Sequence, residues 1–321
     1  VEGAVQRTSD RVRITMRLIE ATPDRQLWEQ SYEGDVQDVL ALQSRVAVDV
    51  AGEIEMAVTG KQGISSASKK LVNAEAYDAY LKGHYHLRKR NKGGFRQAVA
   101  FFERAIEKDP SYASAYAGLA DVYDMLAGYA LLPPTEAYPK ARAAAITALQ
   151  IDDQLAEAHT ALAKVKARQD WDWQGAERGF LRAIELNPGY APGHHWYGYF
   201  YLAALGRYDK AIEELKQAKR LDPLSININT ELGLILSWAG KHERAIEQLQ
   251  NTLEIDPDFS WTHAVLGRAY FNKGMFEAAI KEFQEAAKLS EDKPNSLYLS
   301  ALGLAYGAAG REQEARKVLG T

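Results

Sequence analysis

The histidines of this chain are the residues best suited to metal chemistry, and their spacing argues against it. A zinc pair on a helix needs two ligands three or four residues apart, because only that spacing places them on one face. His194 and His195 are adjacent, and His84 and His86 are two residues apart. His242 has no second histidine four residues further on. The sequence therefore predicts no metal site.

No other group of residues supports catalysis or a bound cofactor. Thr59-Gly60-Lys61 lacks the upstream glycine and the following hydroxyl residue of a phosphate-binding loop. The chain has no cysteine, which excludes a thiol nucleophile, cysteine metal ligands and disulfides. The carboxylates are scattered at repeat spacing, whereas a general acid and base must share a pocket. We therefore predict that the protein is not an enzyme, with no catalytic residue and no cofactor.

A basic run, Arg88-Lys89-Arg90-Asn91-Lys92, is followed by Arg96. Such a run suits nucleic acid or an acidic partner, but a solvated helix end is the simpler interpretation. The whole chain has a net charge of −4 and lacks the basic footprint of a dedicated nucleic-acid binder. We predict no direct contact with nucleic acid.

The composition is that of an ordinary globular protein, with 321 residues of which 46% are hydrophobic and 26% charged. No apolar run reaches the roughly 18–20 residues that cross a bilayer, so no membrane contact is predicted for this stretch. The chain starts at Val1 and leads directly into strand-like sequence, so we expect a fragment of a longer protein. A chain without cysteine fits the cytoplasm and the periplasm alike. The compartment stays open, with the cytoplasm favoured.

Residues 1–60 predict a small α+β segment of three strands and a helix. Three stretches rich in β-branched and apolar residues predict the strands: 1–7, 12–20 and 26–32. A helix capped by Asp35 is expected to follow, with its apolar face at Val39, Leu42, Val46, Val50 and Ile54. So short a segment makes a poor core and leaves a strand edge exposed. A homodimer formed through residues 1–60 is therefore one hypothesis.

Four stretches of this segment carry a family resemblance: Val1-Glu2-Gly3-Ala4-Val5, Arg11–Leu18, Leu27-Trp28-Glu29-Gln30-Ser31-Tyr32 and Asp38-Val39-Leu40-Ala41-Leu42-Gln43. They resemble the latter half of the TolB amino-terminal-like domain, which also occurs in FlgO-like proteins. In bacteria that domain often lies between an amino-terminal signalling module and a tetratricopeptide array. The module is typically a winged-helix DNA-binding domain, an adenylate cyclase or a serine/threonine kinase. The alternative is an unrelated α+β cap on the repeats.

Corners formed by an acidic residue or asparagine and a proline recur along the rest of the chain, at Asp109-Pro110, Asn187-Pro188, Asp222-Pro223 and Asp256-Pro257. The last three prolines are 35 and 34 residues apart. A period of that size predicts a stack of two-helix units, each too small to bury its own apolar face. The polar residues before the first unit predict a linker over 61–73.

The sixth unit has the recurring positions most fully, at Leu266, Gly267, Tyr270, Ala279, Phe283 and Ala286. This pattern resembles the tetratricopeptide repeat, and the resemblance covers residues 74–321. It implies a mainly α fold, an α–α superhelix of about seven helix pairs with the last one truncated, preceded by the α+β segment. The units are expected near 76–112, 113–155, 156–190, 191–225, 226–259, 260–295 and 296–321.

The same resemblance implies a binding groove. In tetratricopeptide arrays the first helix of each unit, helix A, lines the concave face through its second, fifth, ninth and twelfth positions. The candidate residues for binding a peptide or protein are Tyr77, Tyr80, His84, Lys164, His195, Tyr199, Trp261, Arg268 and Phe271. Aromatic residues and arginine are enriched at binding hot spots, and we expect about half of this set to be accessible. The lysine and asparagine set of the carboxylate clamp is absent, so capture of a free C-terminus is not predicted.

Three functional hypotheses follow. The first is a non-catalytic interaction and sensing scaffold, the C-terminal regulatory region of a larger bacterial signalling protein, whose partner is a protein or peptide. The second is the regulatory arm of a winged-helix transcriptional regulator, an adenylate cyclase or a serine/threonine kinase. The third is a homo-oligomerisation scaffold in which strand edges of residues 1–60 pair between chains.

Overall fold

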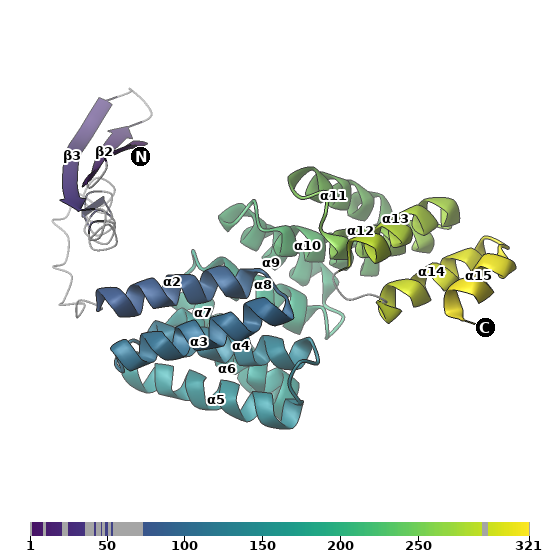
Figure 1. The fold of residues 1–321 in the computed structure, drawn as a ribbon, viewed down its shortest axis with the longest axis horizontal. Helices are drawn as coiled ribbons and strands as arrows, with labels where there is room; N and C mark the ends of the chain where they lie inside the picture. Colours follow the sequence, from purple (N-terminus) through teal and green to yellow (C-terminus); the bar gives the residue numbers. More distant parts are fainter. Residues whose placement is uncertain are drawn as a thin grey trace. The chain divides into compact units, whose positions relative to one another are not determined.

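The computed structural model describes residues 2–8, 11–20, 25–35, 73–290 and 295–320, together with helical positions 42, 46, 49, 50 and 53. The chain forms two compact units, Val1–Leu119 and Ala120–Thr321, which are described separately below. Figure 1 shows strands near the N-terminus and helices from α2 onwards. The linker expected before Asn73 and the helix positions Val39 and Ile54 lie outside the described residues.

An antiparallel sheet with the strand order β1-β2-β3 occupies the start of the first unit. Its strands are β1 (Glu2–Arg7), β2 (Arg11–Glu20) and β3 (Arg25–Asp35). The three predicted strands are confirmed, but β3 is longer than expected. Asp35 is the last residue of this strand, paired with Arg11 of β2, and the residues after it, where the helix that it is predicted to cap would begin, lie outside the described ones.

The sheet has one apolar face and one polar face, as the alternation in β2 predicts. Val12, Ile14 and Tyr32 are buried on the apolar face, where they pack against Leu42 and Val46 of the expected helix. Polar pairs cross the strands on the other face: Arg13–Glu33, Thr15–Ser31 and Arg17–Glu29. Among the described residues, this small core lies on one side of the sheet, the face that carries Ile14.

Paired helices make up the remainder of the chain. In the first unit α2 (Ala74–Arg88) packs against α3 (Lys92–Lys108), and the division between the units falls within α4 (Ala113–Gly128). The later helices are α5 (Pro134–Ile151), α6 (Ala156–Val165), α7 (Trp173–Leu186), α8 (Ala191–Trp196), α9 (Tyr208–Leu221), α10 (Ile226–Trp238), α11 (His242–Ile255), α12 (Ser260–Asn272), α13 (Phe276–Leu289), α14 (Ser296–Ala308) and α15 (Glu312–Leu319).

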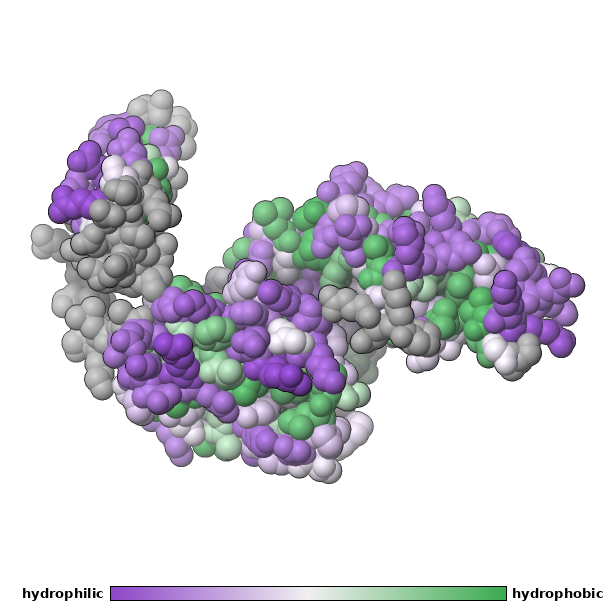
Figure 2. Space-filling view, viewed as in Figure 1, coloured by the Kyte–Doolittle hydropathy of each residue, from purple (hydrophilic) through white to green (hydrophobic). Residues whose placement is uncertain are grey.

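The helices alternate between two roles, as the repeat pattern predicts. The second helix of each repeat, helix B, packs against helix A of its own repeat and against helix A of the next repeat. Thus α11 packs against α10 and α12, and α13 packs against α12 and α14. Helices A also contact each other directly, α10 with α12 and α12 with α14. Hydrophilic residues cover most of the visible surface in Figure 2, with hydrophobic ones in smaller patches between them. The predicted fold class is confirmed.

Helix A carries a glycine where helix B approaches it most closely. A Cβ atom added at Gly233 in α10 would lie 2.5 Å from the Leu249 side chain of α11. One added at Gly267 in α12 would lie 2.8 Å from the Phe283 ring of α13. Both distances are below van der Waals contact, so a larger residue forces the two helices apart. The glycine therefore sets the spacing within these two helix pairs, whereas α6 contains no glycine and has Ala163 in the corresponding place.

Hydrogen bonds from the side chain of the fourth residue in helix A stabilise the corners between repeats. Each of these side chains donates a hydrogen bond to the carbonyl oxygen six residues earlier: His159 to Asp153 at 2.9 Å, His194 to Pro188 at 3.1 Å, Asn229 to Pro223 at 2.9 Å and His263 to Pro257 at 2.9 Å. In two of these, the other ring nitrogen bonds a helix B carboxylate, His194 to Glu214 and His263 to Glu282, both at 2.7 Å. These histidines therefore have a structural role at the corners.

One extra residue in two consecutive helices A explains the uneven spacing of the prolines. The first residues of helices A and B are 17 positions apart in two units (Ala156 to Trp173, Ala191 to Tyr208) and 16 apart in the next three (Ile226 to His242, Ser260 to Phe276, Ser296 to Glu312). The additional residue is accommodated in π-helical turns, η2 (Lys166–Asp170) and η3 (Tyr197–Leu202). The step of 35 residues between Pro188 and Pro223, which contains η3, is thus one residue longer than the next.

We predict that Gly267→Ala lowers the free energy of unfolding by about 1–3 kcal/mol, because its Cβ clashes with the Phe283 ring. Gly307→Ala in α14 is the matched control, since a Cβ there meets nothing within 4 Å. That change should raise stability by roughly 0.5 kcal/mol through helix propensity alone. Urea unfolding of both variants measures the difference, and equal effects would contradict the packing account.

The bond to Glu282 raises the pKa of His263; burial opposes this, and the Pro257 carbonyl and nearby Glu285 add to the rise. A raised pKa in the folded state means that the protonated ring stabilises the fold at low pH and that this contribution is lost as pH rises through the folded pKa. We predict that the stability lost in His263→Asn is largest below the unfolded pKa, about 6.5, and shrinks above it. Asn229 fills this position in α10, so asparagine keeps the corner bond without titrating. Thermal melts of the wild type and of His263→Asn at pH values below and above the unfolded pKa test this prediction. A stability difference that does not change with pH would contradict it.

Candidate functional site

The aromatic candidates of the first unit lie on α2 and are half-buried. Tyr77 stacks on Tyr80 at 6.3 Å between ring centroids, and Tyr80 meets the edge of His84 at 4.5 Å. His84 and Tyr80 also contact Phe102 of α3, at 5.1 and 6.0 Å. The structure brings these three residues together, as their spacing predicts. One side of the cluster packs against the core, and the other side is accessible to solvent.

Lys164, by contrast, is completely buried in the second unit. Its ammonium lies 2.7 Å from the Asp121 carboxylate and 3.1 Å from that of Asp124, which is itself 1% exposed. It also lies over the Trp196 ring, 4.6 Å from the centroid. Burial lowers the pKa of Lys164, but the two carboxylates more than offset this and raise it. Lys164 is therefore not a groove residue as predicted. It belongs to a charged structural cluster, and none of its side chain is open to a ligand.

The π turns place further side chains against this buried cluster. Arg168, in η2, lies 3.4 Å from Asp124 and stacks over the Phe200 ring of η3 at 4.0 Å. π-helical turns often occur at functional sites because they change where neighbouring side chains point. Here the turns let Lys164 and Arg168 share one acidic side chain. Both turns were missed in the sequence analysis, although the spacing of 35 between Pro188 and Pro223 was a signal of the second one, η3.

His195 is also inside the protein, at 4% exposure, where Nε2 bonds the Glu231 carboxylate of α10. Its ring is stacked with that of the half-buried Tyr199, 6.1 Å away. On the next helix Thr230 bonds Thr262 of α12 at 2.6 Å. Polar contacts therefore join α4 to α6, α8 to α10 and α10 to α12, and the cation–π contact of Lys164 with Trp196 joins α6 to α8. These contacts position the helices, and of the candidates in this region only Tyr199 reaches the surface.

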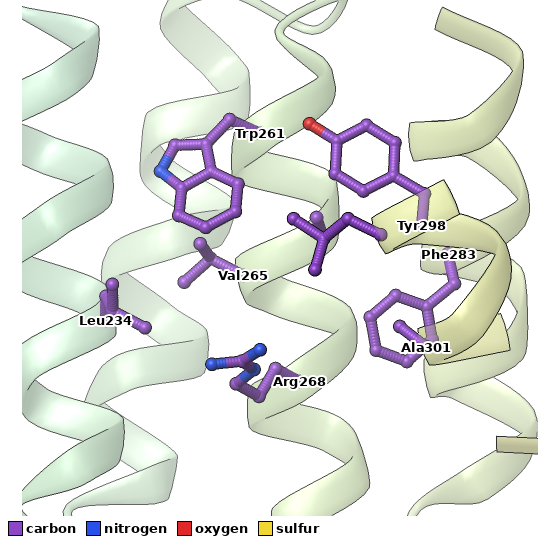
Figure 3. A pocket seen from close by; sticks show the side chains of 9 residues that line it. Leu234, Trp261, Val265, Arg268, Phe283, Tyr298 and Ala301 are labelled. Atoms are coloured by element: carbon purple, nitrogen blue, oxygen red, sulfur yellow. The ribbon is translucent and has the colours of Figure 1, made fainter. Parts of the chain in front are cut away.

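A groove with open surface lies further along the second unit, between α10, α12 and α14. Trp261 and Phe271 are half-buried there and Arg268 is exposed. One small cavity of about 20 Å³ lies next to Trp261, and a larger one of about 380 Å³ lies next to Phe271. Both are lined by Arg268. Figure 3 shows the Arg268 side chain reaching from α12 into the space between Leu234 and Phe283.

The groove contains residues absent from the predicted set. Trp238 of α10 and Leu304 of α14 line the larger cavity at 42% and 67% exposure, and Leu297 lines the smaller one at 54% exposure. Leu297 and Leu304 occupy the second and ninth positions of their helix A, so the positional rule already pointed to them. Trp238 is the thirteenth residue of α10 and lies outside that rule. Large apolar side chains exposed in one groove mark an interaction surface.

Within the described part of the chain, no cluster of three or more metal-ligating side chains occurs. Among the same residues, no helix combines the length and the apolar character that a membrane crossing requires. Tyr197 has its pKa raised to about 12 by burial and by the nearby Glu177 carboxylate, so the phenol stays protonated and donates to Glu177. This tyrosine lies in the packing between η3 and α7, away from both cavities.

Comparison with known proteins supports the repeat assignment. Residues 180–213 and 239–303 each match a tetratricopeptide repeat family. "Putative adenylate cyclase 3" of Rhizobium meliloti (strain 1021) is 28% identical over 120 residues, which are 37% of this chain and 20% of that protein. The match thus spans only about a fifth of that relative's length. The chain contains tetratricopeptide repeats.

Several solved structures share the fold. PilF of Pseudomonas aeruginosa aligns with a TM-score of 0.51 at 20% identity, over 65% of this chain and 89% of that one. PilW, a type IV pilus biogenesis factor, aligns with a TM-score of 0.52 at 21% identity, over 62% and 90%. The APC/C assembly Cut9–Hcn1 gives 0.54 at 17% identity, over 84% and 56%. At these identities the likeness concerns the fold alone.

We predict that Lys164→Met lowers the free energy of unfolding by about 3 kcal/mol, because it leaves the Asp121 and Asp124 carboxylates without their buried counter-charge. Adding Asp124→Asn to the same chain should recover part of the loss. Lys281→Met, at an exposed helix B position, is the control and should change stability by no more than about 0.5 kcal/mol. Urea unfolding decides it, and a Lys164 variant as stable as the control would contradict the cluster's role.

Proposed function

We propose that this chain is a non-catalytic protein-interaction region, and that the groove between α10, α12 and α14 binds a segment of another protein. The observation that supports this most strongly is the cavity of about 380 Å³ beside exposed Trp238 and Leu304. Stacked repeats present such surfaces to extended or helical segments, and aromatic residues with arginine supply their binding energy. Tyr77, Tyr80 and His84 are proposed as a separate contact of the first unit.

The finer proposal is that the chain is the regulatory region of a larger bacterial signalling protein. Two observations support it: the resemblance of residues 1–60 to a TolB-like domain, and the similarity of part of the chain to a protein named as an adenylate cyclase. A cyclase, a kinase or a winged-helix domain would then precede Val1. Sequencing the gene upstream of this codon tests the proposal, and an open reading frame that starts at Val1 would contradict it.

A second candidate function, self-association through the sheet, is favoured by the outer edge of β1, which pairs with no further strand among the described residues. Val5 lies on the same face as buried Ile14, with which it is paired, but is 69% exposed. An edge strand with an exposed apolar residue is a template for strand pairing. Light scattering tests this candidate: a monomer at high micromolar concentration contradicts it.

For the groove, we predict that Leu304→Asp and Trp261→Ala each weaken capture of the partner by at least roughly tenfold, as expected for central interface residues. Leu224→Asp is the matched control, because Leu224 is 71% exposed but lies at a corner between α9 and α10, outside both cavities. The measurement is affinity capture with the full chain, quantified for each protein recovered. If both groove variants capture every partner as the wild type does, the groove assignment is wrong.

A further inference from the structure

The larger cavity in the groove has an almost wholly apolar wall. Trp238, Phe271, Phe283, Ala301 and Leu304 line it, together with Arg268 and Asn272. A volume of about 380 Å³ is within the range of protein ligand pockets, which is about 300–1,000 Å³, and accommodates a large apolar side chain. The smaller cavity of about 20 Å³ has room for roughly one water molecule. A ligand therefore has one place to bury an apolar side chain.

Arg268 supplies the only charge among the residues that line the two cavities. Its side chain is exposed, and no ion pair or hydrogen bond joins it to any other residue that the structure describes. Other arginines of the second unit are paired, Arg207 with Glu177 and Arg311 with Glu277. A guanidinium beside an apolar wall binds a carboxylate through two parallel hydrogen bonds, which strengthen when the ligand excludes water.

The single cation also limits the charge of the ligand. Phosphorylated segments are usually held by clusters of arginine, whereas the cavities here offer one guanidinium and the amide of Asn272. A single carboxylate matches this donor set in charge and geometry. An uncharged apolar segment would fill the cavity but would bury Arg268 without a partner, at a cost in desolvation.

We infer that the groove between α10, α12 and α14 recognises a segment in which an aspartate or glutamate side chain neighbours a large apolar residue. This inference rests on the proposed binding function of the groove. The apolar side chain occupies the cavity between Trp238 and Leu304, and the carboxylate pairs with Arg268. The acid is an internal side chain, because a chain terminus would bring an additional set of polar backbone groups to a wall that offers few donors.

The test is a selection on the full chain from random twelve-residue segments displayed inside a carrier loop, so that no segment has a free end. The selected segments are then synthesised with both ends blocked, and their affinity is measured by fluorescence polarisation. We expect an acidic residue within two positions of a large apolar one. Arg268→Gln should weaken these peptides about 10- to 100-fold, the range for a lost charge-assisted bond. Arg268→Lys should retain part of the affinity.

Two controls separate the possible failures. Arg244→Gln removes one exposed positive charge from α11, outside both cavities, and should bind as the wild type does. Leu304→Asp blocks the apolar wall and reports on the groove itself. Peptides that lose affinity in Leu304→Asp but not in Arg268→Gln, or that lack an acid, would overturn the inference and leave the binding function standing. Peptides indifferent to both variants would overturn both. Because Arg268 is exposed and unpaired among the described residues, its variants should have the same melting temperature as the wild type.

Discussion

The close approach of helices A and B at a glycine is the constraint on which the rest of the structure depends. With Gly267 beneath the Phe283 ring, two helices pack at short range but leave apolar surface on their outer sides. That surface is covered only when the next helix A stacks on helix B, as α14 does on α13. Each helix pair therefore depends on its neighbours in the array for stability, and the helix A face is the surface on which we propose that binding occurs.

Repeat periodicity was enough to predict the helix pairs, because apolar and small residues recur at the same positions in every unit. It was not enough to predict which residues of the helix A face are open. Lys164 and Arg268 both lie on helix A, yet one is buried against Asp121 and Asp124 and the other is exposed. The difference comes from neighbouring helices in space and from the π turn after Val165, which a positional rule does not contain.

The helix A face of the second unit thus has two parts with different physical characters. From α4 to α10 its centre is closed by buried polar contacts, including Lys164 with Asp124 and His195 with Glu231. Such contacts fix the relative placement of helices. From α10 to α14 the contacts are apolar and incomplete, and Arg268 lies among them without an ion-pair partner in the described part of the chain. Fixed helices next to an open groove are typical of a preorganised binding surface, which does not have to change its conformation when the partner binds.

The tryptophans allow this account to be tested directly. The chain has six, of which Trp261 and Trp238 line the groove. Trp171 is 71% exposed and lies between η2 and α7, outside both cavities. Indole N–H signals in a nitrogen–proton NMR spectrum of the full chain report on each one during titration with a selected blocked peptide. The account predicts that the Trp238 and Trp261 signals shift together and saturate with the measured affinity while Trp171 stays unchanged. Shifts confined to Trp171 and its neighbour Trp173 would contradict it.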